Sequence, residues 1–228
     1  MNYFEVSPLV ITHARESVLT YASTTVLKAG QIVTVEVGKR QVAAVVIKKV
    51  AKPNFATKEI AALLEDTPLP PSFVQLHDWL AGYYATHPAL VWHTMLPRGL
   101  NKKRRASTTK RVPSARDTTP FTLNTEQRHA VDTILSTQSN THLLHGVTGS
   151  GKTAVYIELA KETIAEGRSV IILVPEIALT SQLVAEFTPH FPAIHVTHST
   201  MTEAARHTLW QTVLKSDTAQ VIIGPRSA

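Results

Sequence analysis

The stretch GVTGSGKT, residues 146–153, is a complete match to the glycine-rich loop that binds phosphate groups. Glycines let such a loop turn tightly and point its backbone N–H groups at phosphate oxygens. An apolar segment, 141–145, precedes the loop, and a helical pattern, 152–166, follows it. Bound phosphates would therefore lie at a helix N-terminus, where the dipole favours anions. The pattern predicts a strand, a loop and a helix that bind a nucleoside triphosphate.

Two side chains of this loop could contact the phosphates or their metal ion directly. The Lys152 ammonium is a point charge for the β- and γ-phosphates, and the Thr153 hydroxyl can bind Mg²⁺. The alternative, a glycine-rich turn that arose by chance, does not explain the strand and helix patterns on either side. The candidate phosphate-binding residues are Gly146, Val147, Thr148, Gly149, Ser150, Gly151, Lys152 and Thr153.

Length and composition limit the class of protein. A chain of 228 residues, 43% of them hydrophobic, can form one or two domains with apolar cores. It has no apolar run long enough to span a bilayer and no signal-peptide pattern at its N-terminus, so we expect a soluble cytoplasmic protein without a membrane partner. The absence of cysteine excludes disulfides and thiolate metal sites in this chain.

Positive charge is concentrated in one short segment. Eight basic residues lie between Arg98 and Arg116, with no acidic residue among them. Removing these eight from the chain's 23 basic residues leaves 15, against 17 acidic ones, so the net charge of +6 comes from this segment. Such a run attracts phosphate backbones, but it is equally typical of a solvated linker. The residues that we expect to contact DNA here are Lys102, Lys103, Arg104 and Arg105.

The N-terminal part of the sequence reads first as β-structure and then as helices. Extended, apolar patterns over 3–11, 31–37 and 41–50, with a turn at Gly38-Lys39, predict a small antiparallel barrel or sheet. Helical patterns follow over 58–64, 72–85 and 88–96. Four aromatic residues on these helices are interpreted as a buried face rather than a base-stacking platform: Trp79, Tyr83, Tyr84 and Trp92.

From Leu123 onward, helices and strands alternate. A helix over 125–135 begins with the spacing of a capping box, formed by Asn124 and Gln127. Further predicted strands cover 169–174, 193–196 and 220–223, and further predicted helices cover 179–187 and 202–214. The run 169–174 is continuously apolar, as in a parallel strand covered on both faces. This part of the chain predicts a doubly wound α/β sheet with the nucleotide at the carboxyl ends of its strands.

The sequence ends at Ala228, directly after an apolar strand pattern. A P-loop sheet needs further strands and an acidic residue that organises Mg²⁺ and water. No such acid follows a later strand, so we expect an incomplete P-loop sheet that does not hydrolyse a nucleotide on its own.

The same residues resemble one protein family. The segment 143–160, the run LVPEIALT at 173–180, His198-Ser199 and the run IIGPRSA at 222–228 are similar, in this order, to the PriA-type replication-restart helicases of superfamily 2. The run LNTEQ at 123–127 is similar to the adenine-reading segment of that family. Three N-terminal segments resemble its 3′-end DNA-binding domain: 28–30, 35–39 and 79–84.

The resemblance implies roles for particular residues. Lys152 and Thr153 would hold ATP and Mg²⁺, and Gln127 would contact the adenine. The N-terminal domain would bind the 3′-OH of a nascent strand near Tyr21, Gly38 and Lys39. The single-strand path of the first RecA-like lobe would be lined by His198, Ser199, Arg226 and Ser227. The implied partners are single-stranded and forked DNA with a 3′ end, single-strand-binding protein and other primosome proteins, and the implied zinc site lies in a C-terminal part that this chain lacks.

The sequence also departs from the family pattern. The family carries a winged-helix domain between its 3′-end-binding domain and its helicase core, and here only the basic segment stands there. The family's aromatic-acidic-Tyr signature is replaced by Leu19-Thr20-Tyr21. The predicted organisation is a 3′-end DNA-binding domain over 1–98, a basic flexible linker over 99–120 and the first part of a RecA-like lobe over 121–228.

Three functions remain compatible with these residues. The first is an ATP-dependent helicase that moves 3′ to 5′ on single-stranded DNA and restarts stalled forks. The second is a non-catalytic module that binds DNA ends and carries a vestigial P-loop. The third is another superfamily 2 translocase with an unrelated N-terminal domain.

Overall fold

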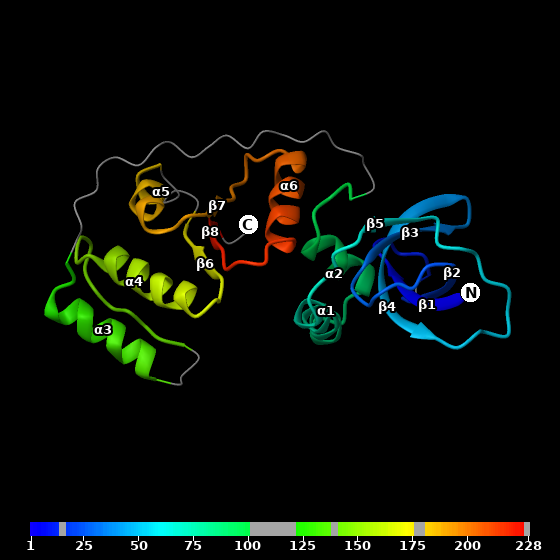
Figure 1. The fold of residues 1–228 in the computed structure, drawn as a ribbon, viewed down its shortest axis with the longest axis horizontal. Coiled ribbons are helices and arrows are strands. Elements are labelled where there is room, and N and C mark those ends of the chain that lie inside the picture. The colour runs from blue at the N-terminus through cyan, green and yellow to red at the C-terminus, as the bar shows by residue number, and fades with distance from the viewer. Residues whose placement is uncertain (14–16, 101–121, 138–140, 176–180, 226–228) are drawn as a thin grey trace. The chain divides into compact units, whose positions relative to one another are not determined.

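The computed structural model describes residues 1–13, 17–100, 122–137, 141–175 and 181–225. The chain forms two compact units (Figure 1). The first unit contains residues 1–107 together with 203–215, and the second contains 108–202 together with 216–228. In the described ranges, no helix is long and apolar enough to cross a membrane.

The first unit is built on a five-stranded antiparallel sheet, with strand order β2-β1-β4-β3-β5 (Figure 1). This confirms the predicted β-rich N-terminal part. Valine and isoleucine dominate the central strands, as expected for side chains that pack well on a pleated surface. The strands are β1 (Asn2–Pro8), β2 (Leu19–Ser23), β3 (Ile32–Val37), β4 (Arg40–Val50) and β5 (Ala62–Glu65).

The two faces of this sheet pack into different apolar clusters. Val33 and Val35 of β3 lie in a cluster with Phe4 and Val6, all without solvent exposure. Ile32, which precedes Val33 and faces the opposite side, belongs to a second cluster formed with Val45, Leu69, Trp92 and Leu96. Because side chains alternate along a strand, β3 is buried on both faces and forms the centre of the unit.

The segment that leads into β5 pairs with the opposite edge of the sheet. Ala22 of β2 donates its N–H to the Lys58 carbonyl at 2.9 Å and accepts the Ile60 N–H at 2.9 Å. The helix predicted over 58–64 is therefore wrong. The backbone groups of residues 58–60 bond to β2, and residues 62–65 form a strand against β3, so neither set is free to make a helical turn.

Two helices of the first unit cover the second cluster, α1 (Pro71–Tyr83) and α2 (Pro88–Met95). Trp92 is fully buried, stacks on His77 at 3.7 Å and donates its indole N–H to the Ser7 hydroxyl at 3.0 Å. The predicted buried aromatic face is wrong for its other members, since Trp79, Tyr83 and Tyr84 are 56–68% exposed. The face of α1 that packs inward carries Phe73 and His77, and Trp79 and Tyr83 point away from it.

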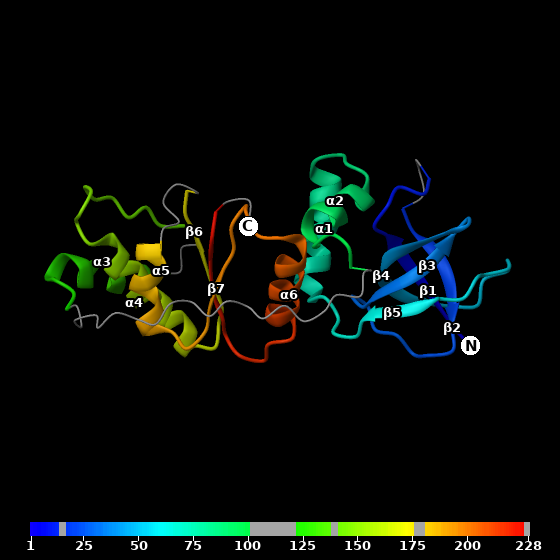
Figure 2. The same cartoon turned by 90° about the horizontal axis from the view of Figure 1, so that it is seen from above.

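The second unit contains a parallel sheet of three strands, in the order β6-β8-β7 (Figure 2). The α/β alternation predicted from residue 123 onward is confirmed. Val170 and Ile194 both pair with Val221, so the three strands start in register. The elements are α3 (Thr125–Ser136), α4 (Lys152–Ala165), β6 (Val170–Leu173), α5 (Ser181–Phe187), η2 (Thr188–His190), β7 (Ile194–Val196) and β8 (Val221–Gly224).

Two predictions about this sheet are wrong. Among the described residues, segment 141–147 contains no strand, and its Leu143 is 91% exposed. An apolar segment becomes a strand only where a neighbouring strand accepts its hydrogen bonds, and 141–145 pairs with none of β6, β7 and β8. The predicted coverage of β6 on both faces also fails, because Ile171 and Leu173 are 68% and 58% exposed. The described sheet is therefore not doubly wound.

The helix α6 (Glu203–Leu214) follows β7 and precedes β8 in the chain, yet it belongs to the first unit. Trp210 and Leu214 of α6 pack against the cluster that contains Trp92. A helix that connects two strands of one sheet thus takes part in the other unit's core.

Candidate nucleotide and nucleic-acid sites

The glycine-rich loop makes a tight turn directly before α4. Gly149 and Gly151 have φ angles of +81° and +79°, in the left-handed region that a side chain disfavours. The Gly151 carbonyl accepts the Ala154 N–H at 3.0 Å and so opens the first turn of the helix. The first N–H groups of a helix have no partner within it, so they are free to point at the loop and at a bound anion.

The Lys152 ammonium lies over the loop that precedes it. Its Nζ donates to the Gly146 carbonyl at 2.7 Å and to the Val147 carbonyl at 2.8 Å. Gly146 allows this close fold, because a Cβ at that position would lie 2.7 Å from the Ser150 hydroxyl oxygen. The loop therefore encloses one positive charge, a geometry that fits a phosphate group.

Gln127 connects α3 to the same loop. It completes the predicted capping box: its N–H donates to the Asn124 Oδ1 at 2.8 Å, and its Oε1 accepts the Asn124 N–H at 3.0 Å. Its Nε2 donates to the Ser150 carbonyl at 3.1 Å. The structure therefore brings Gln127 to the loop, where its side chain links the start of α3 to Ser150. The adenine contact that the resemblance implies stays a prediction.

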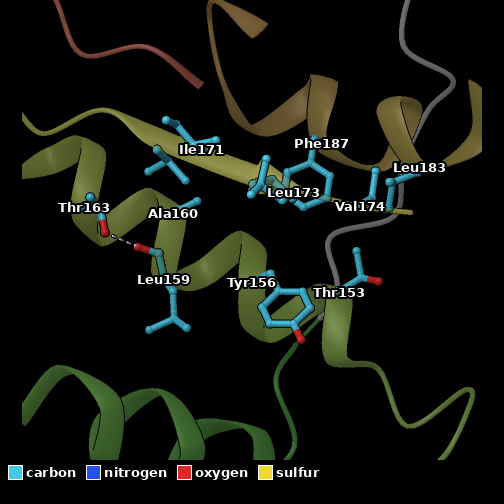
Figure 3. Close-up of a pocket in the computed structure, with 12 residues that line it drawn as sticks. Thr153, Tyr156, Leu159, Ala160, Thr163, Ile171, Leu173, Val174, Leu183 and Phe187 are labelled. Atoms are coloured by element: carbon cyan, nitrogen blue, oxygen red, sulfur yellow. Dashed lines mark hydrogen bonds between the residues drawn. The ribbon is translucent and has the colours of Figure 1, made fainter. Parts of the chain in front are cut away.

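Thr153, in the first turn of α4, lies at one end of a groove of about 460 Å³ (Figure 3). The groove runs between α4 and β6 and reaches α5. Its walls are largely apolar, with Tyr156 and Ala160 from α4, Ile171 and Leu173 from β6, and Phe187 from α5. Of the loop residues, only Thr153 lines it. Because its lining is largely apolar, this groove is not suited to phosphate, and the glycine-rich loop stays the candidate phosphate site.

The Mg²⁺ ligand predicted from the sequence is a single hydroxyl. In the part of the chain that the structure describes, no three His, Asp or Glu side chains come together as a metal site. Mg²⁺ bound with a nucleotide takes most of its ligands from phosphates and water, so one hydroxyl such as that of Thr153 fits this role.

A second candidate site lies at the end of the β3–β4 hairpin. The buried Tyr21 donates its hydroxyl to the Glu36 carbonyl at 2.7 Å. Lys58 donates to the Glu36 carboxylate at 2.6 Å and to the Gly38 carbonyl at 3.0 Å. Gly38 has a φ angle of +61°, and a Cβ there would meet no atom within 4 Å, so the turn faces open space. The Tyr21 hydroxyl and the Lys58 ammonium therefore both bond to Glu36, and Lys58 also bonds to the open turn at Gly38.

The structure brings together three predicted residues and adds one that the sequence did not reveal. Tyr21 bonds to Glu36, and Lys58 bonds to both Glu36 and Gly38, while Lys39 is exposed in the same turn. Lys58 was missed because its segment was predicted as a helix. The charge of Lys58 was a partial indication of such a role, since a lysine next to a strand edge in a basic protein is a candidate for phosphate contact. Burial and the nearby Glu36 charge raise the pKa of Tyr21, so its hydroxyl keeps its proton.

The residues predicted to line a single-strand path are only partly described. His198 and Ser199 follow the carboxyl end of β7, and the His198 Nδ1 lies 2.7 Å from the Thr200 hydroxyl oxygen. Arg226 and Ser227 follow β8 and lie outside the described residues, as do Lys102, Lys103, Arg104 and Arg105. Because β7 and β8 are parallel, the carboxyl ends of these two strands lie at the same edge of the sheet.

Two family models match the chain. Residues 9–97 match the 3′ DNA-binding domain of PriA, and residues 120–226 match the Res subunit of type III restriction enzymes, a helicase-type domain. The first match contains the Tyr21 and Gly38 cluster, and the second contains the glycine-rich loop.

Curated relatives carry the name replication restart protein PriA. The relative from Chlamydia trachomatis is 45% identical over 114 residues, which cover 48% of this chain and 15% of the relative. The relative from Treponema pallidum is 35% identical over 177 residues, 75% of this chain and 26% of the relative. The relative from Rickettsia conorii is 30% identical over 212 residues, 89% of this chain and 31% of the relative.

The chain thus spans between about a seventh and a third of the length of these relatives. Its N-terminal part carries a PriA-specific domain, its second part carries a helicase-type domain, and the similarity to PriA proteins extends over both. On these findings, the chain is similar to the PriA replication restart proteins in both of its parts.

Proposed function

We propose that this chain supplies the DNA-end-binding domain and the nucleotide-binding loop of an ATP-dependent DNA helicase that acts in replication restart. The observation that supports this most is the combination of two features on one chain. A lysine is enclosed by a glycine-rich loop at a helix start, and a tyrosine–lysine cluster lies at an open turn of a domain matched to 3′-end binding.

In this proposal, the loop binds the phosphates of ATP. Phosphate oxygens replace the two carbonyls that now hold the Lys152 ammonium, while the loop amides and the start of α4 supply further donors. Thr153 holds Mg²⁺, which neutralises charge on the phosphates when bound. Gln127 contacts the adenine from the end of α3, where the capping box fixes its backbone.

The first unit binds the 3′ end of a DNA strand. The Tyr21 hydroxyl and the Lys58 ammonium lie on either side of Glu36, with Gly38 and Lys39 at the open turn. We further propose that the pairing of Ala22 with residues 58–60 closes the sheet of this unit into a small barrel, which would fix Lys58 beside β2.

In the same proposal, the rest of the DNA contact is made through the backbone. His198, Ser199, Arg226 and Ser227 contact a single strand that moves 3′ to 5′ through the complete helicase, and the basic residues 102–105 contact duplex phosphates. The partners are forked DNA, single-strand-binding protein and other primosome proteins. Because an acid that organises Mg²⁺ is missing, residues 1–228 alone bind ATP without hydrolysing it.

The nucleotide site is tested by titrating residues 1–228 with a fluorescent ATP analogue. We expect Lys152→Ala to weaken binding about 10- to 100-fold, since it removes charge-assisted hydrogen bonds to phosphate. Lys161→Ala, a matched control on the same helix, removes a lysine paired with Glu158 and should leave the affinity unchanged. Equal affinities for wild type and Lys152→Ala would refute the proposed ATP site.

The alternative of a DNA-end-binding module with a vestigial loop is favoured by one observation. The segment before the loop is not a strand of the described sheet and its Leu143 is exposed, whereas Gln127 of α3 bonds to the loop at Ser150. The same titration separates the two functions: absence of nucleotide binding by the wild-type chain, together with retained binding of 3′-ended single strands, would support the alternative.

A further inference from the structure

A single buried carboxylate in the first unit accepts hydrogen bonds from α6. Glu65 ends the edge strand β5, and its side chain is 3% exposed. Its Oε1 lies 2.9 Å from the Lys215 Nζ and accepts the Thr67 N–H at 3.2 Å, and its Oε2 accepts the Gln211 Nε2 at 3.0 Å. Two of these three donors come from α6 or the residue after it. A buried carboxylate is tolerated only when such donors satisfy it, so Glu65 and α6 depend on one another.

The apolar contacts of α6 lie on the same helix face as the polar ones. His207 is buried and stacks on Trp210, and Trp210 and Leu214 pack against the cluster around Trp92. Positions 207, 210, 211, 214 and 215 follow the three- and four-residue spacing of one helical stripe. The whole inward face of α6 is therefore complementary to the first unit, with the Glu65 carboxylate at the end of an apolar contact.

The strand β3 links this contact to the candidate 3′-end site. Its first residue, Ile32, pairs with Glu65, and its fifth residue, Glu36, accepts the Tyr21 hydroxyl and the Lys58 ammonium. The four residue steps between them span about 13 Å of extended backbone. Residues 32–35 are fully packed on both faces, so this strand is rigid.

We propose that Glu65 is a positioning residue that holds α6 on the first unit through Gln211 and Lys215, a contact that we call the clasp. We also propose that DNA-end binding at the far end of β3 changes the stability of this contact. A change at α6 could reach the neighbouring chain, because His198-Ser199, proposed to contact a single strand, lies shortly before α6 in the sequence. The proposed effect of DNA-end binding on α6 rests on the proposed function, whereas the clasp between Glu65 and α6 does not.

The clasp is tested without DNA, by hydrogen exchange of the α6 backbone amides in residues 1–228. We expect Glu65→Ala to speed exchange over 203–215 by about tenfold or more, because it leaves Lys215 and Gln211 without their acceptor. Glu65→Gln, which keeps an acceptor for Gln211 but loses the ion pair, should have a smaller effect. Glu5→Ala is the matched control, since it removes a carboxylate paired with Lys48 at 3.2 Å elsewhere in the same unit.

Two outcomes would overturn the clasp: unchanged α6 exchange in Glu65→Ala with the rest of the unit folded, or equal acceleration in Glu5→Ala. Lys215→Met tests the ion pair without altering the buried carboxylate and should accelerate α6 exchange while exchange in β1 stays unchanged.

The link to DNA is tested by adding a single strand with a free 3′-OH to the same samples, with binding followed by anisotropy. We expect α6 exchange to change about threefold or more in the wild type and not in Glu65→Ala. Bound DNA that leaves wild-type α6 exchange unchanged would overturn the link. Absence of DNA binding would contradict the proposed function of the first unit and with it the link, while the clasp would still be decided by the exchange measured without DNA.

Discussion

The sheets of the two units differ in how completely their apolar residues are covered. In the first unit, Ile32 and Val33 are fully buried on opposite faces of β3, and Ala22 of the edge strand β2 pairs with residues 58–60. In the second unit, β6 leaves Ile171 and Leu173 exposed on one face, beside an apolar groove along α4. An antiparallel sheet can be built from strands that are near in sequence, whereas a parallel sheet depends on strands and helices from distant segments.

This difference predicts where stability lies. The first unit buries its apolar residues among its own elements, so single core residues should determine its free energy of unfolding. The exposed β6 face of the second unit contributes little, because its side chains lose little water-accessible area on folding. All three tryptophans, Trp79, Trp92 and Trp210, belong to the first unit, so tryptophan fluorescence follows that unit alone.

The largest expected effect is in the core of the first unit. Phe4→Ala removes a fully buried ring from the cluster that contains Val33 and Val35. We expect the free energy of unfolding of this unit to fall by about 3–5 kcal/mol, through lost apolar transfer and a residual cavity. Urea unfolding followed by tryptophan fluorescence measures the loss.

The contrasting substitution is Ile171→Ala on β6. Because Ile171 is 68% exposed, we expect a change within about 0.5 kcal/mol in the stability of the second unit, followed by hydrogen exchange of α4. A large loss from Ile171→Ala would show that the exposed face is covered in solution, and the comparison between the two sheets would then be wrong.

A smaller effect compares two glycines in the left-handed region, one in each unit. A Cβ at Gly151 would lie 2.3 Å from the Gln127 Nε2, whereas a Cβ at Gly38 would meet nothing within 4 Å. Both alanine variants carry the backbone cost of about 1–2 kcal/mol for a left-handed non-glycine residue. Gly151→Ala must also displace Gln127, which holds the Ser150 carbonyl.

We therefore expect Gly38→Ala to lower the stability of the first unit by about 1–2 kcal/mol and to leave ATP binding unchanged. Gly151→Ala should weaken binding of the fluorescent ATP analogue about tenfold or more, equivalent to about 1.4 kcal/mol. The comparison would be contradicted if the two variants bound the analogue equally well.

The sequence was most informative where local patterns decide the structure. The capping box at Asn124 and Gln127 and the turn at Gly38 follow from residue chemistry within a few positions. Each was predicted, and the structure has each. The elements with strong periodicity, α1, α2 and α4, were likewise found within one or two residues of their predicted bounds.

The sequence was misleading where distant partners decide the structure. The apolar runs 141–145 and 169–174 look alike in sequence, but only the second has a neighbouring strand, at Val221–Gly224. Residues 58–64 carry helix-forming side chains, but pairing of their backbone with Ala22 and β3 overrides that preference. Lys58 became a site candidate for the same reason, since only tertiary pairing places it beside Tyr21 and Gly38.

The smallest expected effect is on the pH dependence of folding stability, which should run in opposite directions in the two units. In the first unit, burial and then the Glu36 charge raise the pKa of Tyr21 above its usual value of about 10. In the second unit, burial and then the Lys161 charge lower the pKa of His190 below its usual value of about 6.5, although Glu158 acts in the opposite direction. Each shift favours the neutral form in the folded state.

The consequences for stability follow from which state holds more protons. The contribution of Tyr21 is fully present below pH 10 and is lost as the pH rises through its folded pKa, because the unfolded tyrosine releases its proton first. The contribution of His190 is present above pH 6.5 and is lost as the pH falls toward its folded pKa, because the unfolded histidine takes up a proton first. Alkali should therefore destabilise the first unit, and mild acid should destabilise the second.

We expect Tyr21→Phe to flatten the alkaline limb of the fluorescence-detected stability and His190→Gln to flatten the limb below pH 6.5 in α4 hydrogen exchange. If either variant altered the limb of the other unit instead, the two sheets would not be the independent sources of stability that their packing indicates.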